Sequence, residues 1–196
     1  MSDKTVTDLL NAIFQDDNIQ AISNISGTKI SQAKEVINIS LPELFNSLSK
    51  NNETQEGEKA FFDTLDKHNG SVLNNIIGTI NNNETRIDGA KILVHIFGEK
   101  ESEIIKNIVL KTGVTDDQAK TILQTTAPLV LESLGKAKLD NGLSASGITK
   151  VLKEYFGKKG GNTIVGSLFD KDRDGDIKDD LLTMFINWIK GFFLKK

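Results

Sequence analysis

The sequence predicts an all-α protein, a multihelical bundle built from two similar pseudo-repeats. Apolar residues recur at helical spacing along most of the chain, no segment shows the alternation typical of a strand, and both prolines lie in two similar stretches. With 196 residues, 38% of them hydrophobic, the chain can bury a core as a single domain over 1–196.

The N-terminal stretch, about 4–15, is predicted to form an amphipathic first helix. Asp3 and Asp8 deprive it of the uninterrupted apolar core of a secretory signal, and a small-residue cleavage site is also missing. No stretch of the sequence reaches the roughly eighteen apolar residues that a membrane span requires. We therefore expect a cytoplasmic protein.

Pro42 and Pro128 lie in the two most similar stretches, 86 residues apart. We expect two equivalent core helices, about 31–49 and 115–134, within pseudo-repeats of about 27–110 and 113–196. Each helix should kink or break just before its proline, because proline removes a backbone hydrogen bond and crowds the preceding turn. The equivalent apolar positions are Ala33, Val36, Ile37, Leu41, Leu44 and Leu48 in the first helix and Ala119, Ile122, Leu123, Ala127, Val130 and Leu134 in the second.

The same spacing predicts further helices, separated by Gly, Asn and acidic clusters. Their ranges are about 57–66, 71–80, 88–97, 101–112, 146–156, 161–168 and 178–194.

A second similarity joins two turns, Leu65–Gly78 and Asp170–Leu182, when Gly70 is aligned with Gly175. The second turn carries carboxylates where the first has amides and a hydroxyl. Asn and Ser already cap helix N-termini well, so capping alone does not explain the added acids.

The second turn has the spacing of a calcium loop. Asp170, Asp172 and Asp174 occupy positions 1, 3 and 5, and Gly175 occupies position 6, where the loop turns sharply. These positions supply the carboxylate oxygens that Ca²⁺ prefers. The sequence therefore predicts an EF-hand-like loop that binds a structural Ca²⁺.

The end of this loop departs from the usual pattern. Asp176, at position 7, would donate its backbone carbonyl, but Leu181 replaces the bidentate Glu of position 12. Asp179 and Asp180 are the two candidates for closing the loop, Asp179 being placed as in short calcium loops of the excalibur type. Asp binds less fully than Glu, so we expect modest affinity. A single loop favours a structural clamp over a sensor, because sensor EF-hands work in pairs.

The alternative explanation is helix capping without metal. Asp176, Asp179 and Asp180 would favour the N-terminus of the last helix by roughly 0.3–1 kcal/mol each. Asp170, Asp172 and Asp174 precede that helix, so their mutual repulsion would still need a cation.

The last predicted helix, about 178–194, is strongly apolar and aromatic. Trp188, Phe192 and Phe193 could contact a membrane surface or a partner protein. The commoner role of such a helix is to close a core. A metal-independent adaptor that uses this helix is the alternative function.

The composition argues against several other classes of function. The net charge is −3, with no basic stripe to hold a nucleic-acid backbone. Without cysteine the chain has no disulfide, thiolate nucleophile or sulfur-ligated metal. His68, in a turn, and His95, one turn before the expected helix cap Gly98, have no recognisable nucleophile beside them. We therefore expect a protein that is not an enzyme.

The paired proline helices, the segment DGAKILVHIFG at Asp88–Gly98 and the acidic C-terminal loop resemble the bacterial YidB-like family, a domain of unknown function. The similarity covers the chain from about Gly27 onward. It implies a multihelical bundle with two similar halves, and it supplies no activity, ligand or catalytic residue.

Overall fold

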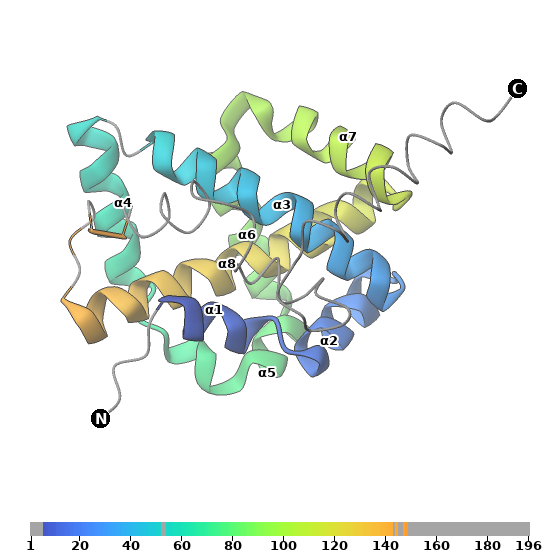
Figure 1. Cartoon of the computed structure of the whole chain (residues 1–196), viewed down its shortest axis with the longest axis horizontal. Coiled ribbons are helices and arrows are strands. Elements are labelled where there is room, and N and C mark those ends of the chain that lie inside the picture. The colour runs from blue at the N-terminus through green and yellow to red at the C-terminus, as the bar shows by residue number, and fades with distance from the viewer. Residues whose placement is uncertain (1–5, 52–53, 143, 145–146, 149–196) are drawn as a thin grey trace, which may run out of the picture. The chain divides into compact units, whose positions relative to one another are not determined.

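The computed structural model describes residues 6–51, 54–142, 144 and 147–148 (Figure 1). This part of the chain is helical and contains no strand, which confirms the all-α prediction. Its α-helices are α1 (Val6–Ile13), α2 (Asp16–Ser26), α3 (Ile30–Asn51), α4 (Gln55–Lys67), α5 (Ile76–Asn81), α6 (Asn83–Phe97), α7 (Glu101–Thr112) and α8 (Asp116–Asn141), and its 3-10 helices are η1 (Ser71–Asn75) and η2 (Gly98–Lys100).

Helix α8 is the centre of the described part. It contacts α1, α2, α3, α4, α6 and α7 (Figure 1), and every residue from 125 to 135 is buried. A helix that is enclosed on all sides must be apolar around its whole circumference, as the stretch APLVLESLG at 127–135 nearly is. None of the described helices combines the length and the apolar content needed to cross a membrane.

The two predicted core helices are present as α3 and α8. They begin 86 residues apart, at Ile30 and Asp116, and all twelve predicted core positions are buried. Both helices continue through their prolines, so the helix does not break at either one, and the bend stays a prediction.

Helix α6 packs closely against α8 near Pro128. Because Pro128 has no N–H, the carbonyl of Gln124 lacks its usual partner four residues on. Gly89 of α6 lies against that carbonyl, and a Cβ at this position would come within 1.8 Å of the Gln124 oxygen. A glycine is therefore required where α6 crosses α8.

The similarity between the two proline helices extends to the helices that precede them. Ser26 ends α2 and Thr112 ends α7, again 86 residues apart, and each hydroxyl donates to the carbonyl four residues back at 2.8 Å. Each is followed by a glycine in the left-handed region, Gly27 at φ 64° and Gly113 at φ 68°. Helix α2 was not expected from the sequence, so the similarity begins earlier than the predicted limit at residue 27.

The contacts of these helices are reciprocal. Helix α2 contacts α8 and α7 contacts α3, while α3 and α8 contact each other. The side chain of Gln118 donates to the carbonyl of Gly27 at 2.9 Å, which joins the two turns. The described residues thus hold two similar helix pairs, α2–α3 and α7–α8. The predicted limits of 27–110 and 113–196, and the single domain over 1–196, stay predictions because residues 149–196 lie outside the described part.

Candidate functional site

The residues predicted to bind metal or a partner lie outside the described residues. The predictions for them therefore remain as the sequence gives them. They are Asp170, Asp172, Asp174, Asp176, Asp179 and Asp180 for the metal, and Trp188, Phe192 and Phe193 for the partner or membrane.

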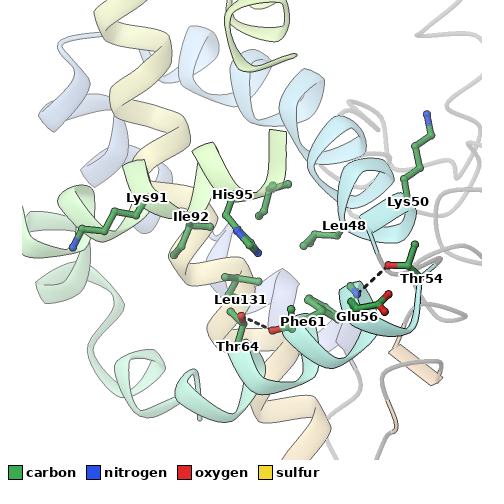
Figure 2. A pocket seen from close by; sticks show the side chains of 13 residues that line it. Leu48, Lys50, Thr54, Glu56, Phe61, Thr64, Lys91, Ile92, His95 and Leu131 are labelled. Atoms are coloured by element: carbon green, nitrogen blue, oxygen red, sulfur yellow. Dashed lines mark hydrogen bonds between the residues drawn. The ribbon is translucent and has the colours of Figure 1, made fainter. Parts of the chain in front are cut away.

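The described helices enclose an open groove of about 790 Å³ between α3, α4, α6 and α8 (Figure 2). Its floor is apolar and comes from one side chain of each helix. Leu48, Phe61, Ile96 and Leu131 form this floor, and all four are buried. The groove therefore opens directly onto the hydrophobic core.

Helix α4 forms one wall of the groove with its smallest residues. Gly57, Ala60 and Thr64 lie at spacings of three and four, which places them on one face of the helix. The start of this helix is fixed by Thr54, whose hydroxyl accepts from the N–H of Gly57 at 3.0 Å (Figure 2). Small side chains on this face leave the space that larger ones would fill.

The rim of the groove is polar and carries charges of both signs. Lys50, Lys91 and His95 line it together with one acid, Glu56, and all four are exposed. Lys91 is paired with Asp88 at 3.0 Å on the outer surface. Figure 2 shows the His95 ring directed into the space between α6 and α4. Gly98 ends α6 as expected, with its N–H donating to the carbonyl of Val94.

A second polar site joins the turn after α4 to helix α8. Glu132 is only 7% exposed, and its carboxylate is held from two directions. Nδ1 of His68 lies 3.0 Å from Oε1, and the N–H of Gly70 donates to Oε2 at 2.7 Å. A buried carboxylate is tolerated only when it is bonded in this way, so Glu132 fixes the turn in place.

Neighbouring residues of α8 complete this attachment. A Cβ on Gly135 would lie 1.5 Å from the carbonyl oxygen of His68, so only glycine permits the close approach. Lys138 forms an ion pair with Asp66, and its ammonium lies 3.2 Å from the centre of the Phe62 ring. This Lys is 8% exposed, which strengthens a cation–π contact relative to an exposed one.

This turn is the first copy of the predicted calcium loop, and protein donors hold it. His68 and Gly70 meet a carboxylate that comes from α8, so the turn needs no carboxylates of its own. In α3 the residue equivalent to Glu132 is Asn46, which is exposed. Within the described ranges, no group of three or more His, Asp or Glu side chains could hold a metal ion.

Two carboxyl groups near the start of α3 have shifted pKa values. Lys34 bonds Asp16 at 2.7 Å and holds the pKa of that exposed carboxyl below its ordinary value. Partial burial raises the pKa of Glu35. Neither group lines the groove.

Comparison with known families gives one match. The family described as bacterial protein of unknown function, DUF937, matches residues 8–137. The chain belongs to the DUF937 family. This confirms the predicted YidB-like membership. No curated protein and no solved structure matches the chain.

The DUF937 match covers a different range from the one expected. It begins at residue 8, before Gly27, and ends at residue 137. It therefore includes both similar helix pairs, the four helices of the groove and Glu132. The acidic loop lies beyond the matched range.

Sequence reasoning missed the groove and the role of Glu132. The groove needs side chains from four helices, and its signal in the sequence is weak: the face of small residues formed by Gly57, Ala60 and Thr64. Glu132 could have been noticed as the one acid within the apolar stretch APLVLESLG.

Proposed function

We propose that this DUF937 chain is a non-catalytic helical module of the cytoplasm that binds a structural Ca²⁺ through the loop Asp170–Asp180. The observation that carries the proposal is the spacing of Asp170, Asp172, Asp174 and Gly175. Acids at positions 1, 3 and 5 before a glycine are the ligands and the turn of a twelve-residue calcium loop.

The comparison with the first turn supports the proposal. There, two neutral or positive donors, His68 and Gly70, meet the carboxylate of Glu132. In the second copy the acids lie in the loop, and the equivalent helix residue is the neutral Asn46. Carboxylates gathered without such a partner repel one another, and a divalent cation removes this repulsion.

The absence of catalysis is proposed from the surroundings of the two histidines. His68 is held by the buried Glu132 in a contact that fixes a turn. His95 lies on the rim of an apolar groove. In the described part of the chain, neither histidine is hydrogen-bonded to a Ser or Thr hydroxyl that could act as a nucleophile.

A thermal melt of the full chain in calcium and in chelator tests the metal proposal. At a hundredfold excess over the dissociation constant, the ion should add about 2.7 kcal/mol to the free energy of unfolding. For a chain of this size the melting temperature should rise by roughly 5–10 °C. The double variant Asp172→Asn and Asp174→Asn should lose this rise.

The matched control is the double variant Asp116→Asn and Asp117→Asn, which removes two acids from the first turn of α8. It should keep the full calcium effect. Equal melting of the native chain with and without calcium would show that the loop holds no structural ion.

An adaptor that docks through its last helix is the second candidate. Its support is the apolar and aromatic series that includes Trp188, Phe192 and Phe193 at helical spacing, followed by lysines. Flotation with vesicles containing anionic lipid should carry the native chain upward and leave Trp188→Ala behind. Flotation of neither protein, with calcium and without, would exclude membrane docking.

A further inference from the structure

The first turn of a further helix follows α8 and begins at Ser144. The Ser144 hydroxyl accepts from the N–H of Gly147 at 3.0 Å, and the Ser144 carbonyl accepts from the N–H of Ile148 at 2.9 Å. These are the capping bond and the first backbone bond of a helix, where the sequence predicts one over about 146–156. Ile148 is 0% exposed, so this helix turns one face away from solvent from its first turn.

The sequence continues this apolar face beyond the described residues. Apolar side chains recur three, four, seven and eight positions after Ile148, as Val151, Leu152, Tyr155 and Phe156. This is the spacing of one helix face. We therefore expect Val151 and Leu152 on the same side as the buried Ile148.

The start of this helix lies beside α4, which forms one wall of the groove. Figures 1 and 2 show the last described residues, in orange, next to α4 in two different views. Leu152 follows Ile148 by about one helical turn, which is roughly 6 Å along a helix axis. The residues directly after Ile148 are therefore close to this wall.

The lining of the groove suits the apolar face of a helix. Gly57 and Ala60 are small residues on one face of α4, and small residues let a second helix approach closely, as Gly89 does where α6 crosses α8. The floor between them and α6 is apolar. The rim carries charges of both signs, and Lys91 is already paired with Asp88. The groove therefore selects apolar side chains and not a charge.

We propose that the groove is the docking site of the chain's own residues 149–153, with Val151 and Leu152 packed on its apolar floor. The buried Ile148 directly precedes this segment and gives it a high effective concentration at the groove, which a separate partner or a second copy lacks. Burial of one leucine favours the docked state by about tenfold or more. The proposal does not depend on the calcium loop, which begins only at Asp170.

Disulfide trapping in the full chain tests the proposal, because the chain has no cysteine of its own. Ala60→Cys, in the groove wall, combined with Val151→Cys or with Leu152→Cys should give a disulfide within one chain under mild oxidation, since such a bond requires close Cβ atoms. Lys59→Cys, on the same helix but outside the lining, is the matched control and should stay reduced with either partner. Mass spectrometry and non-reducing gels identify the bond.

The reactivity of a single thiol gives a second measurement. In Ala60→Cys the thiol should react slowly with a soluble thiol reagent while the segment is docked. Adding Leu152→Asp should raise this rate by about tenfold or more, because the leucine no longer holds the segment on the floor. Adding Lys153→Asp, which leaves the apolar face intact, should not change the rate. Melting curves confirm that each variant is folded.

Three results would overturn the proposal. Equal oxidation of the Ala60→Cys and Lys59→Cys pairs, or oxidation of none of them, would place Val151 and Leu152 outside the groove. A disulfide that forms only between two chains would assign the groove to a second copy. A thiol rate that is the same with and without Leu152→Asp would show that this leucine does not cover the groove.

Discussion

Helices α3 and α8 bury the same apolar positions but hold different neighbours. Three residues of α8 attach the end of α4 and the turn after it. Glu132 accepts a hydrogen bond from the turn, Gly135 leaves room for the close approach of its backbone, and Lys138 forms an ion pair with Asp66. The residues of α3 equivalent to the first two are Asn46 and Ser49. Apolar spacing thus makes both helices central, whereas a few polar and small residues decide which segment docks on each.

The surroundings of the two prolines also differ between α3 and α8. In α8 the carbonyl freed by Pro128 is covered by the backbone of α6 at Gly89. In α3 the carbonyl freed by Pro42 belongs to Asn38, whose own side chain is buried without a partner among the described residues. The contact at the proline of α8 thus depends on a glycine.

Gly89→Ala should produce the largest effect. The new methyl group would collide with the Gln124 carbonyl of the central helix, so α6 must move away from α8. Such overpacking should cost about 3 kcal/mol, or roughly 6–12 °C in melting temperature. The control is Gly78→Ala, where the methyl meets only the movable side chain of Asn75. Equal melting of the two variants would show that the crossing tolerates a side chain.

Gly135 of α8 and Ser49 of α3 are equivalent, and exchanging the residue type at each should lower the free energy of unfolding by unequal amounts. Gly135→Ser places a Cβ against the His68 carbonyl and should cost about 2–3 kcal/mol, because the α4 turn can partly yield. Ser49→Gly should cost only about 0.5 kcal/mol through helix propensity. Urea unfolding curves measure both. Losses of the same size would mean that the turn does not depend on close approach to α8.

Glu132→Gln should destabilise the chain by about 2 kcal/mol, because the bonds from Gly70 and His68 lose their charged acceptor. Asn46→Asp, at the equivalent exposed position of α3, should change stability by no more than about 0.5 kcal/mol. Hydrogen exchange of the Gly70 amide gives a local measure, and it should become faster in Glu132→Gln. Unchanged exchange would contradict the role assigned to Glu132.

The smallest expected effect concerns the start of each helix. Thr115 caps α8 and forms a reciprocal pair with Gln118, whereas α3 has Lys29 at the equivalent position and keeps only the Gln32 half of the pair. Lys29→Thr should therefore stabilise the chain by about 0.5–1 kcal/mol. Thr115→Lys should remove a similar amount, as measured by thermal melting. A lower melting temperature of Lys29→Thr would show that the N-termini of α3 and α8 are not equivalent.

Apolar spacing was enough to predict the helices with a clear buried face. Helix α7 was predicted over its observed range, and the twelve core positions of α3 and α8 were all correct. Helix α2 was missed because polar residues lie on its buried face. Asn18 and Ser23 satisfy their side chains through the carbonyls of Ala12 and Thr28, just outside the two ends of α2, and the apolar spacing of the sequence does not reveal such bonds.

Contacts between distant segments also limited the prediction of helix ends and of the groove. Helix α8 was expected to end near residue 134 but continues to Asn141, because Ala137 and Lys138 are buried in its last turns. A calcium loop could be predicted because its candidate ligands lie within one short segment, and it stays a prediction since they lie outside the described residues. The groove could not, since its four floor residues come from four helices.

The central claim is that a divalent cation balances the acids of the second turn, where protein donors balance Glu132 in the first. Calorimetric titration of Ca²⁺ into the chelator-treated full chain tests this claim most directly. The account predicts one bound ion per chain, and none in the double variant Asp172→Asn and Asp174→Asn. No binding by the native chain, or the same stoichiometry in the variant, would contradict it.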